Sequence, residues 1–120
     1  LKILYMNDKH KNKFSSFSIK GDIKKFNDQY ILKDNTTLNN LVISSTLLYR
    51  NQSTNGHYHE GQEEVYFFLS GIGEMELGKD KFNVSAGDVV LIEDGIFHRV
   101  HNTADTDLYF VCVFDGKRNH

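Results

Sequence analysis

The 120-residue chain contains no proline and no tryptophan, and it has a single cysteine, Cys112. One cysteine permits neither an intrachain disulfide nor a zinc site built from cysteines. Without proline, the turns depend on glycine, asparagine and aspartate. No apolar run approaches the ~18 residues that a membrane span needs, and the apolar stretch at the N-terminus is too short for a signal-peptide core. We therefore expect a cytoplasmic protein with no membrane partner.

The net charge of the whole chain is small, but its two parts carry opposite net charges. The formal net charge is −2, yet residues 1–50 carry nine Lys and Arg against four Asp, whereas residues 51–120 carry five against twelve Asp and Glu. A basic cluster at positions 9–13 has the charge to attract a polyanion. No helical or aromatic-interleaved recognition pattern accompanies it, so we predict that this cluster is solvated and that there is no nucleic-acid partner.

The spacing of turn residues predicts the fold class. The chain is long enough for one domain with its own core, and its glycines recur at intervals that leave room only for short strands. Residues 21–28 are the one stretch with a helical pattern, and that pattern is weak. Many short strands imply an all-β sandwich or barrel. The predicted strands lie near residues 14–19, 29–33, 41–50, 56–60, 64–70, 73–78, 81–84, 89–92, 97–102 and 107–114.

Two of the predicted strands are apolar on both faces. In residues 64–70, Glu64 and Tyr66 share one face, whereas Val65 and Phe67 share the other. The last predicted strand has the same character. A strand that is apolar on both faces must be covered on both. One face lines a core, and the other needs further strands or a partner subunit, so we expect a homodimer.

Two histidines separated by one residue give the clearest chemical signal. On a strand, His57 and His59 point to the same side and present two imidazoles about 7 Å apart. Glu64 follows after a short loop and can add an oxygen ligand, and a third histidine is available at His98. Three His and one Glu leave one or two open positions on an octahedral metal, where a substrate or oxygen can bind. We predict one divalent transition metal, either Fe, Mn, Ni or Zn, held by these four residues.

Two other residues are assigned to structure rather than chemistry. His101 lies three positions after His98, so on a strand it points to the opposite side, and we expect it at the surface. Cys112 shares its parity with Phe110 and Phe114, which predicts a small core residue. The alternative for Cys112 is a thiol that faces the metal cavity.

These segments resemble the two motifs of the cupin superfamily. Asn51 stands where the first motif has glycine, and Glu93 stands where the second has proline. The resemblance implies a single small cupin domain over residues 1–120, with N-terminal strands in 1–50 and the motifs in 51–114. Its fold would be a β-barrel, or double-stranded β-helix of the jelly-roll type, with the metal at its centre. The positions that match the motifs are His57, His59, Glu64, Gly71, Gly87, Gly95, His98 and Asn102.

A narrower resemblance is to the cupin-type phosphoglucose isomerases. Their segment reads Gly-His-x-His, then Glu-x-Tyr, and later His-x-x-x-Asn, and each part has a counterpart here. In that family the glutamate and the tyrosine two residues on lie at the reaction centre, which implies catalytic roles for Glu64 and Tyr66. The gap between the second histidine and the glutamate is shorter in this chain.

Three functions fit this pattern. The first expectation is a metal-dependent isomerase of a sugar or sugar phosphate, in which the metal polarises a carbonyl or holds adjacent hydroxyls. The second is a dioxygenase, because iron with three His and one Glu can bind an enediol or catechol-like substrate together with oxygen. The third is a non-catalytic module that binds a small molecule. An isomerase needs no oxygen, a dioxygenase consumes it, and a binding module shows no turnover.

Overall fold

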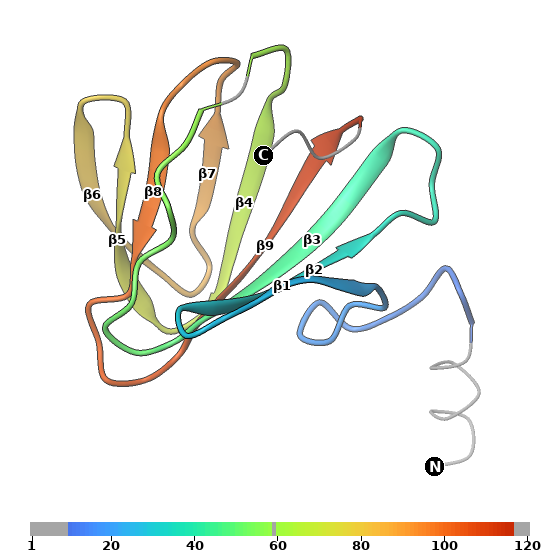
Figure 1. The fold of residues 1–120 in the computed structure, drawn as a ribbon, viewed down its shortest axis with the longest axis horizontal. Coiled ribbons are helices and arrows are strands. Elements are labelled where there is room, and N and C mark those ends of the chain that lie inside the picture. The colour runs from blue at the N-terminus through green and yellow to red at the C-terminus, as the bar shows by residue number, and fades with distance from the viewer. Residues whose placement is uncertain (1–9, 59, 117–120) are drawn as a thin grey trace.

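The structure is a computed structural model that describes residues 10–58 and 60–116. Over these residues the chain forms nine β-strands and no helix, arranged as two sheets (Figure 1). The all-β prediction is confirmed. The described part of the chain accordingly has no helix that could span a membrane.

The two sheets are antiparallel throughout and unequal in size. The strands are β1 (Asp22–Phe26), β2 (Tyr30–Asn35), β3 (Leu41–Leu48), β4 (Glu64–Ser70), β5 (Ile72–Leu77), β6 (Asp80–Ser85), β7 (Val89–Ile92), β8 (His98–His101) and β9 (Leu108–Asp115). The larger sheet has the order β1-β2-β3-β9-β4-β7, and the smaller has the order β6-β5-β8. Strands distant in sequence, such as β3 and β9, are therefore neighbours.

The predicted elements differ from the structure at three places. The weak helical turn predicted over 21–28 is wrong, because pairing with β2 makes this stretch strand β1, and cross-strand pairing overrides a weak local preference. The predicted strand 14–19 is reduced to a bridge between Ser15 and Ser18. Within the described part of 56–60, only His57 forms a bridge. The bounds predicted for β4 and β7 agree with the structure.

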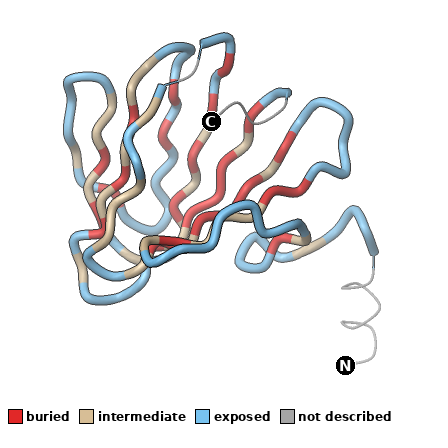
Figure 2. The backbone as a smooth tube through the Cα atoms, in the orientation of Figure 1, coloured by how far each residue is buried: buried red, intermediate tan, exposed pale blue. Residues whose placement is uncertain are grey.

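The buried core lies between the sheets, along the inner faces of their central strands (Figure 2). Tyr66 stacks on Phe110 with 5.1 Å between ring centroids, and Phe68 lies 5.1 Å from the same ring. Met75 on β5 and Val100 on β8 belong to the same buried cluster. The alternation predicted for β4 is therefore confirmed, since one of its faces is buried and the other is partly exposed.

The outer face of the larger sheet is covered over only part of its width. The segment 10–19 packs on it, and Phe17 stacks on Tyr109 with ring centroids 5.9 Å apart. On β7, at the edge of the same sheet, Val89 and Leu91 are 54% and 68% exposed. These two residues lie opposite Phe67 and Val65 of β4. An apolar patch thus remains on the outer side of β4 and β7.

Candidate metal centre

His57 is brought into place by an irregular segment, residues 51–57, that runs beside β8. Thr54 donates its backbone N–H to the Val100 carbonyl at 2.9 Å, and its hydroxyl accepts from the Val100 N–H at 3.0 Å. Farther along, His57 and His98 exchange two backbone hydrogen bonds of 3.2 and 2.9 Å. The segment pairs with β8 at separate points, so it is not a regular strand. It nevertheless sets His57 directly opposite His98.

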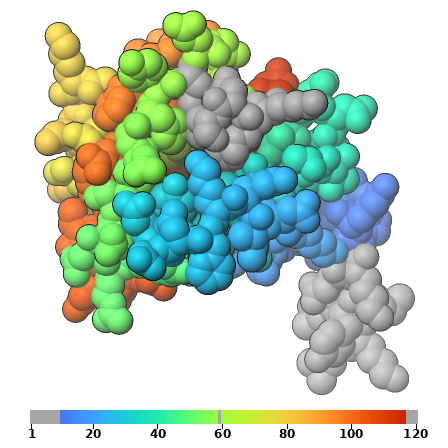
Figure 3. Space-filling view, viewed as in Figure 1, coloured from blue at the N-terminus to red at the C-terminus, as the bar shows by residue number. Residues whose placement is uncertain are grey.

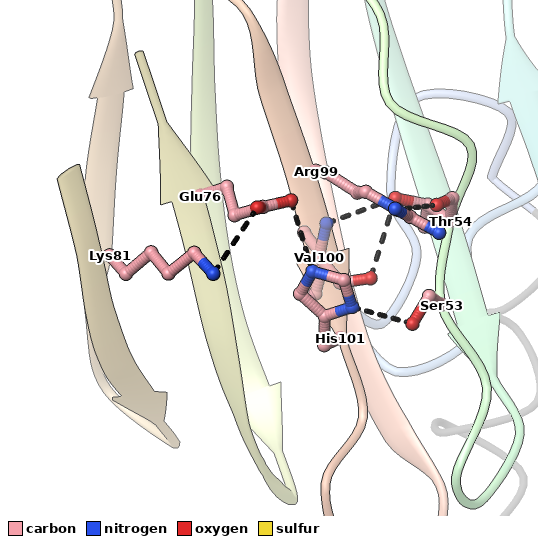
Figure 4. A network of polar contacts seen from close by, with 7 residues as sticks. All are labelled: Ser53, Thr54, Glu76, Lys81, Arg99, Val100 and His101. Carbon is pink, nitrogen blue, oxygen red and sulfur yellow. Dashed lines mark hydrogen bonds and ion pairs between the residues drawn. The ribbon is translucent and has the colours of Figure 1, made fainter. Parts of the chain in front are cut away.

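A polar network on the other side of β8 holds the same segment (Figure 4). The Ser53 hydroxyl lies 2.6 Å from His101 Nδ1, and His101 Nε2 lies 3.0 Å from a Glu76 oxygen. A carboxylate only accepts hydrogen bonds, so Nε2 is the donor, and this bond lowers the pKa of Glu76. Arg99 Nε also donates to the Thr54 carbonyl at 2.8 Å. His101, expected at the surface, is partly buried and ties three segments together.

The glycine before His57 has a packing role. A β-carbon at Gly56 would overlap the ring of Phe97. The same ring makes an edge contact with Tyr58, with centroids 6.3 Å apart. Gly56 therefore allows the segment to pass close to the loop before β8, and this close approach is needed for His57 to meet His98.

Both described histidines of the predicted ligand set are held in the same way. His57 Nδ1 lies 2.9 Å from the Asn55 carbonyl oxygen, and His98 Nδ1 lies 3.0 Å from the Ile96 carbonyl oxygen. A carbonyl only accepts, so Nδ1 carries the proton in each ring. When Nε2 is not protonated, such a ring presents a lone pair there that a metal can take. A backbone hydrogen bond of this kind fixes the tautomer of metal-binding histidines.

His98 lies next to both of the other described ligand candidates, Glu64 and His57. Glu64, the first residue of β4, places Oε2 3.2 Å from His98 Nε2, and both residues are almost fully buried, at 2% and 1% exposed. The His57 and His98 ring centroids are 4.5 Å apart. Tyr66 lies on the same side, with its ring 5.8 Å from His98. The structure therefore places Glu64, His57 and the predicted catalytic Tyr66 each next to His98.

The fourth predicted ligand, His59, lies outside the described residues. Across residues 10–58 and 60–116, the His, Cys, Asp and Glu side chains form no group of three already arranged to hold a metal. The donor chemistry nevertheless fits a first-row divalent ion, because imidazole nitrogens and a carboxylate oxygen are the ligands such ions take. The fit rests on the donor types, on the matching Nδ1 hydrogen bonds of His57 and His98, and on the contact between Glu64 and His98.

A cavity of about 50 Å³ reaches this site at His57 and Tyr66, which both line it. Cys112 lines it, so this residue belongs both to the core and to the cavity wall. Ser44 and Thr46 also line it and are not among the predicted site residues, although they share the buried face of β3 with Val42 and Leu48, a signal that could identify them. The residues that line the cavity are Lys25, Tyr30, Leu32, Ser44, Thr46, Thr54, Asn55, His57, Tyr66, Phe110 and Cys112.

Comparison with known proteins finds similar sequences and similar solved structures. The oxalate-binding protein of Thermotoga maritima is 43% identical over 58 residues, which are 48% of this chain and 47% of that protein. A predicted oxalate decarboxylase from Thermotoga maritima has a TM-score of 0.71 at 23% identity, covering 86% of this chain and 97% of that chain. KdgF from a Halomonas species has a TM-score of 0.73 at 19% identity, covering 82% and 88%.

These likenesses carry different weight. The solved structures are less than 25% identical to this chain, so they show a shared fold. The chain spans about half the length of the curated relatives it matches. The family described as the cupin domain matches residues 47–114, which is more than half of the 120 residues. Because that match includes both motifs and the fold agrees with it, this chain is a member of the cupin domain family.

Proposed function

We propose that this cupin binds one divalent transition metal through His57, His59, Glu64 and His98 and uses it to bind a small, oxygen-rich molecule. The observation that carries the proposal is the 3.2 Å contact between the buried Glu64 and His98 side chains. When bound, the metal would hold adjacent oxygens or polarise a carbonyl. The chain's own residues orient the ligand, because hydroxyls from several strands line the cavity.

Elemental analysis of protein purified without added metal tests this proposal. We expect close to one metal per chain, and we expect removal of the metal with a chelator to lower the unfolding temperature. Oxalate, the ligand named for the Thermotoga maritima relative, is a suitable first probe, because it offers adjacent oxygens. Metal-free protein that gains neither stability nor oxalate binding when Mn²⁺ is added would contradict the proposal.

Isomerisation of a sugar or sugar phosphate is the catalytic role that we propose to test first. The position of Tyr66 favours it. This side chain is 7% exposed, lines the cavity and packs against His98. A tyrosine hydroxyl in such a place can hold or donate a proton at a substrate oxygen. Glu64 would then serve the reaction as well as the metal.

Replacing Tyr66 with phenylalanine is expected to keep the metal content and the fold while lowering turnover by roughly 10- to 1000-fold, the range for loss of a positioned proton donor. The assay is anaerobic conversion between fructose 6-phosphate and glucose 6-phosphate with added manganese or iron. Tyr58→Phe is the matched control, because Tyr58 is 66% exposed. If the metal-loaded wild type converts neither sugar phosphate, this substrate pair is excluded. Oxygen uptake with an enediol or catechol would favour the dioxygenase, and binding without turnover would favour a binding module.

We also propose a homodimer formed through the outer face of β4 and β7. Val65 and Phe67 of β4 lie opposite Leu91 and Val89 of β7, and the last two are more than half exposed. Sedimentation at micromolar concentration should give a species of twice 13.9 kDa. Leu91→Glu should shift it toward the monomer, whereas the control Ile72→Glu, on the smaller sheet, should not. A wild type that sediments only at 13.9 kDa would rule the dimer out.

A further inference from the structure

The pairing of β1 with β2 contains a bulge at Lys24. Ile23 lies opposite Lys33 and Lys25 lies opposite Leu32, so Lys24 is an extra residue without a direct partner. In a regular strand, residues 23 and 25 would point to the same face. Lys33 and Leu32 are consecutive and point to opposite faces, and Ile23 and Lys25 each share the face of their partner. The bulge therefore turns Lys25 to the side of Leu32, as bulges near functional sites often do.

The side of Leu32 is the cavity side. Lys25 and Leu32 both line the cavity together with His57 and Tyr66. Strand β1 is the edge strand of the larger sheet, and in the space-filling view the blue atoms of the first strands lie at the front of the molecule (Figure 3). Lys25 is exposed, so its flexible stem can carry the ammonium over the opening. Lys25 thus lines the cavity although it belongs to an edge strand, whereas most of the other lining residues come from more central strands.

The charged side chains in the cavity wall are of one sign. Among the described residues that line it, Lys25 is the sole Lys or Arg, and none is an Asp or Glu. Most of the other polar residues in the wall carry hydroxyl groups. Over the part of the chain that the structure describes, no carboxylate forms an ion pair with Lys25. Its charge is therefore available to a ligand.

We propose that Lys25 binds an oxyanion group of the ligand, a carboxylate or a phosphate, and thereby selects anions over neutral molecules of similar size. This inference rests on the proposed function, since it takes the cavity beside the metal centre as the ligand site. The metal would hold one set of ligand oxygens, and Lys25 holds the anionic end. Lys25 is in this sense a specificity-determining residue, and it has no part in binding the metal.

Lys24 provides a matched control. It carries the same charge at the neighbouring position, but it lines a different depression together with Asp34 and Val42. Lys24→Met and Lys25→Met therefore change the net charge equally, and only the second removes a cavity-lining cation. Lys25→Arg keeps the charge and tests whether a cation at this position is sufficient.

The experiment is calorimetric titration of the Mn²⁺-loaded protein with oxalate and, separately, with inorganic phosphate, at low and high salt. We expect one of these oxyanions to bind the wild type. Lys25→Met should bind it at least about 10-fold more weakly, as when a charge-assisted hydrogen bond is lost, and with a smaller salt dependence. Lys25→Arg should stay within a few-fold of the wild type, and Lys24→Met should be unchanged. The oxyanion that binds identifies a carboxylate or a phosphate ligand.

The outcomes that overturn the proposal differ from those that overturn the metal centre. The assignment of Lys25 fails if neither oxyanion binds the wild type, if Lys25→Met binds as the wild type does, or if Lys24→Met weakens binding equally. Metal content should be the same in all four proteins. If no metal is bound and oxyanion binding still depends on Lys25, the metal centre is wrong and the assignment of Lys25 stands.

Discussion

His98→Ala is expected to abolish stoichiometric metal binding. His98 contacts both Glu64 and His57. The substitution therefore removes one metal ligand and also the side chain against which two other proposed ligands pack. Changes to groups that merely support ligands cost about 10- to 100-fold in affinity, and loss of a ligand should cost more than about 100-fold. A metal at 100 times its dissociation constant stabilises the folded state by about 2.7 kcal/mol. The wild type should therefore gain roughly 10 °C in unfolding temperature on metal addition, and the variant should gain none.

Two further variants separate metal binding from folding. His101→Ala removes the same residue type from the same strand, but His101 belongs to the network with Glu76 on the other side of β8. It should lose some stability and keep its metal. His57 is less buried than His98, so His57→Ala should stay folded while losing the metal. Full metal content in both His57→Ala and His98→Ala, measured by elemental analysis of folded protein, would refute the assigned ligand set.

Much of the site could be predicted because its residues follow simple periodic rules. Glu64 and Tyr66 point inward because they alternate with Val65 along a regular strand, and the structure agrees. Cys112 is buried among its predicted neighbours for the same reason. For Glu64, Tyr66 and Cys112 the strand is regular, and two-residue periodicity is enough to fix the face. The grouping of His98 with Glu64 comes from the resemblance to the two motifs and not from periodicity.

The remaining features depend on irregular backbone, which periodicity does not describe. The bulge at Lys24 reverses the face of Lys25, and no residue pattern in β1 marks it. The segment that carries His57 follows β8 through separate hydrogen bonds, so its predicted strand is mostly absent from the described residues. His101 is on the predicted side, but Glu76 and Ser53 come from other segments and partly bury it. Only tertiary pairing determines these contacts.

Asn102→Ala is expected to cost about 2–4 kcal/mol of unfolding free energy, because the buried Asn102 side chain bonds to four backbone groups and all of these hydrogen bonds are lost at once. Asn102 is 3% exposed. Its Nδ2 lies 3.0 Å from the Leu48 carbonyl oxygen, 3.1 Å from that of Tyr49 and 2.8 Å from that of Thr106, and its Oδ1 accepts from the Ala104 N–H at 3.0 Å. These bonds join the end of β3 to the loop after β8. They hold the residues that immediately precede the segment 51–57, which carries His57.

An isosteric change shows whether the amide donors of Asn102 carry this effect. Asn102→Asp keeps the shape but replaces Nδ2 with an oxygen, which would face the same backbone carbonyls without a proton to donate. We expect it to destabilise the protein at neutral pH at least as much as Asn102→Ala does, as measured by chemical denaturation of the metal-free protein. Asn83→Ala, at an exposed position of β6, is the control and should stay within about 0.5 kcal/mol of the wild type. An Asn102→Asp protein as stable as the wild type would show that Asn102 acts by packing alone. The metal affinity of the Asn102 variants should fall together with their stability, because the segment that Asn102 anchors also carries His57.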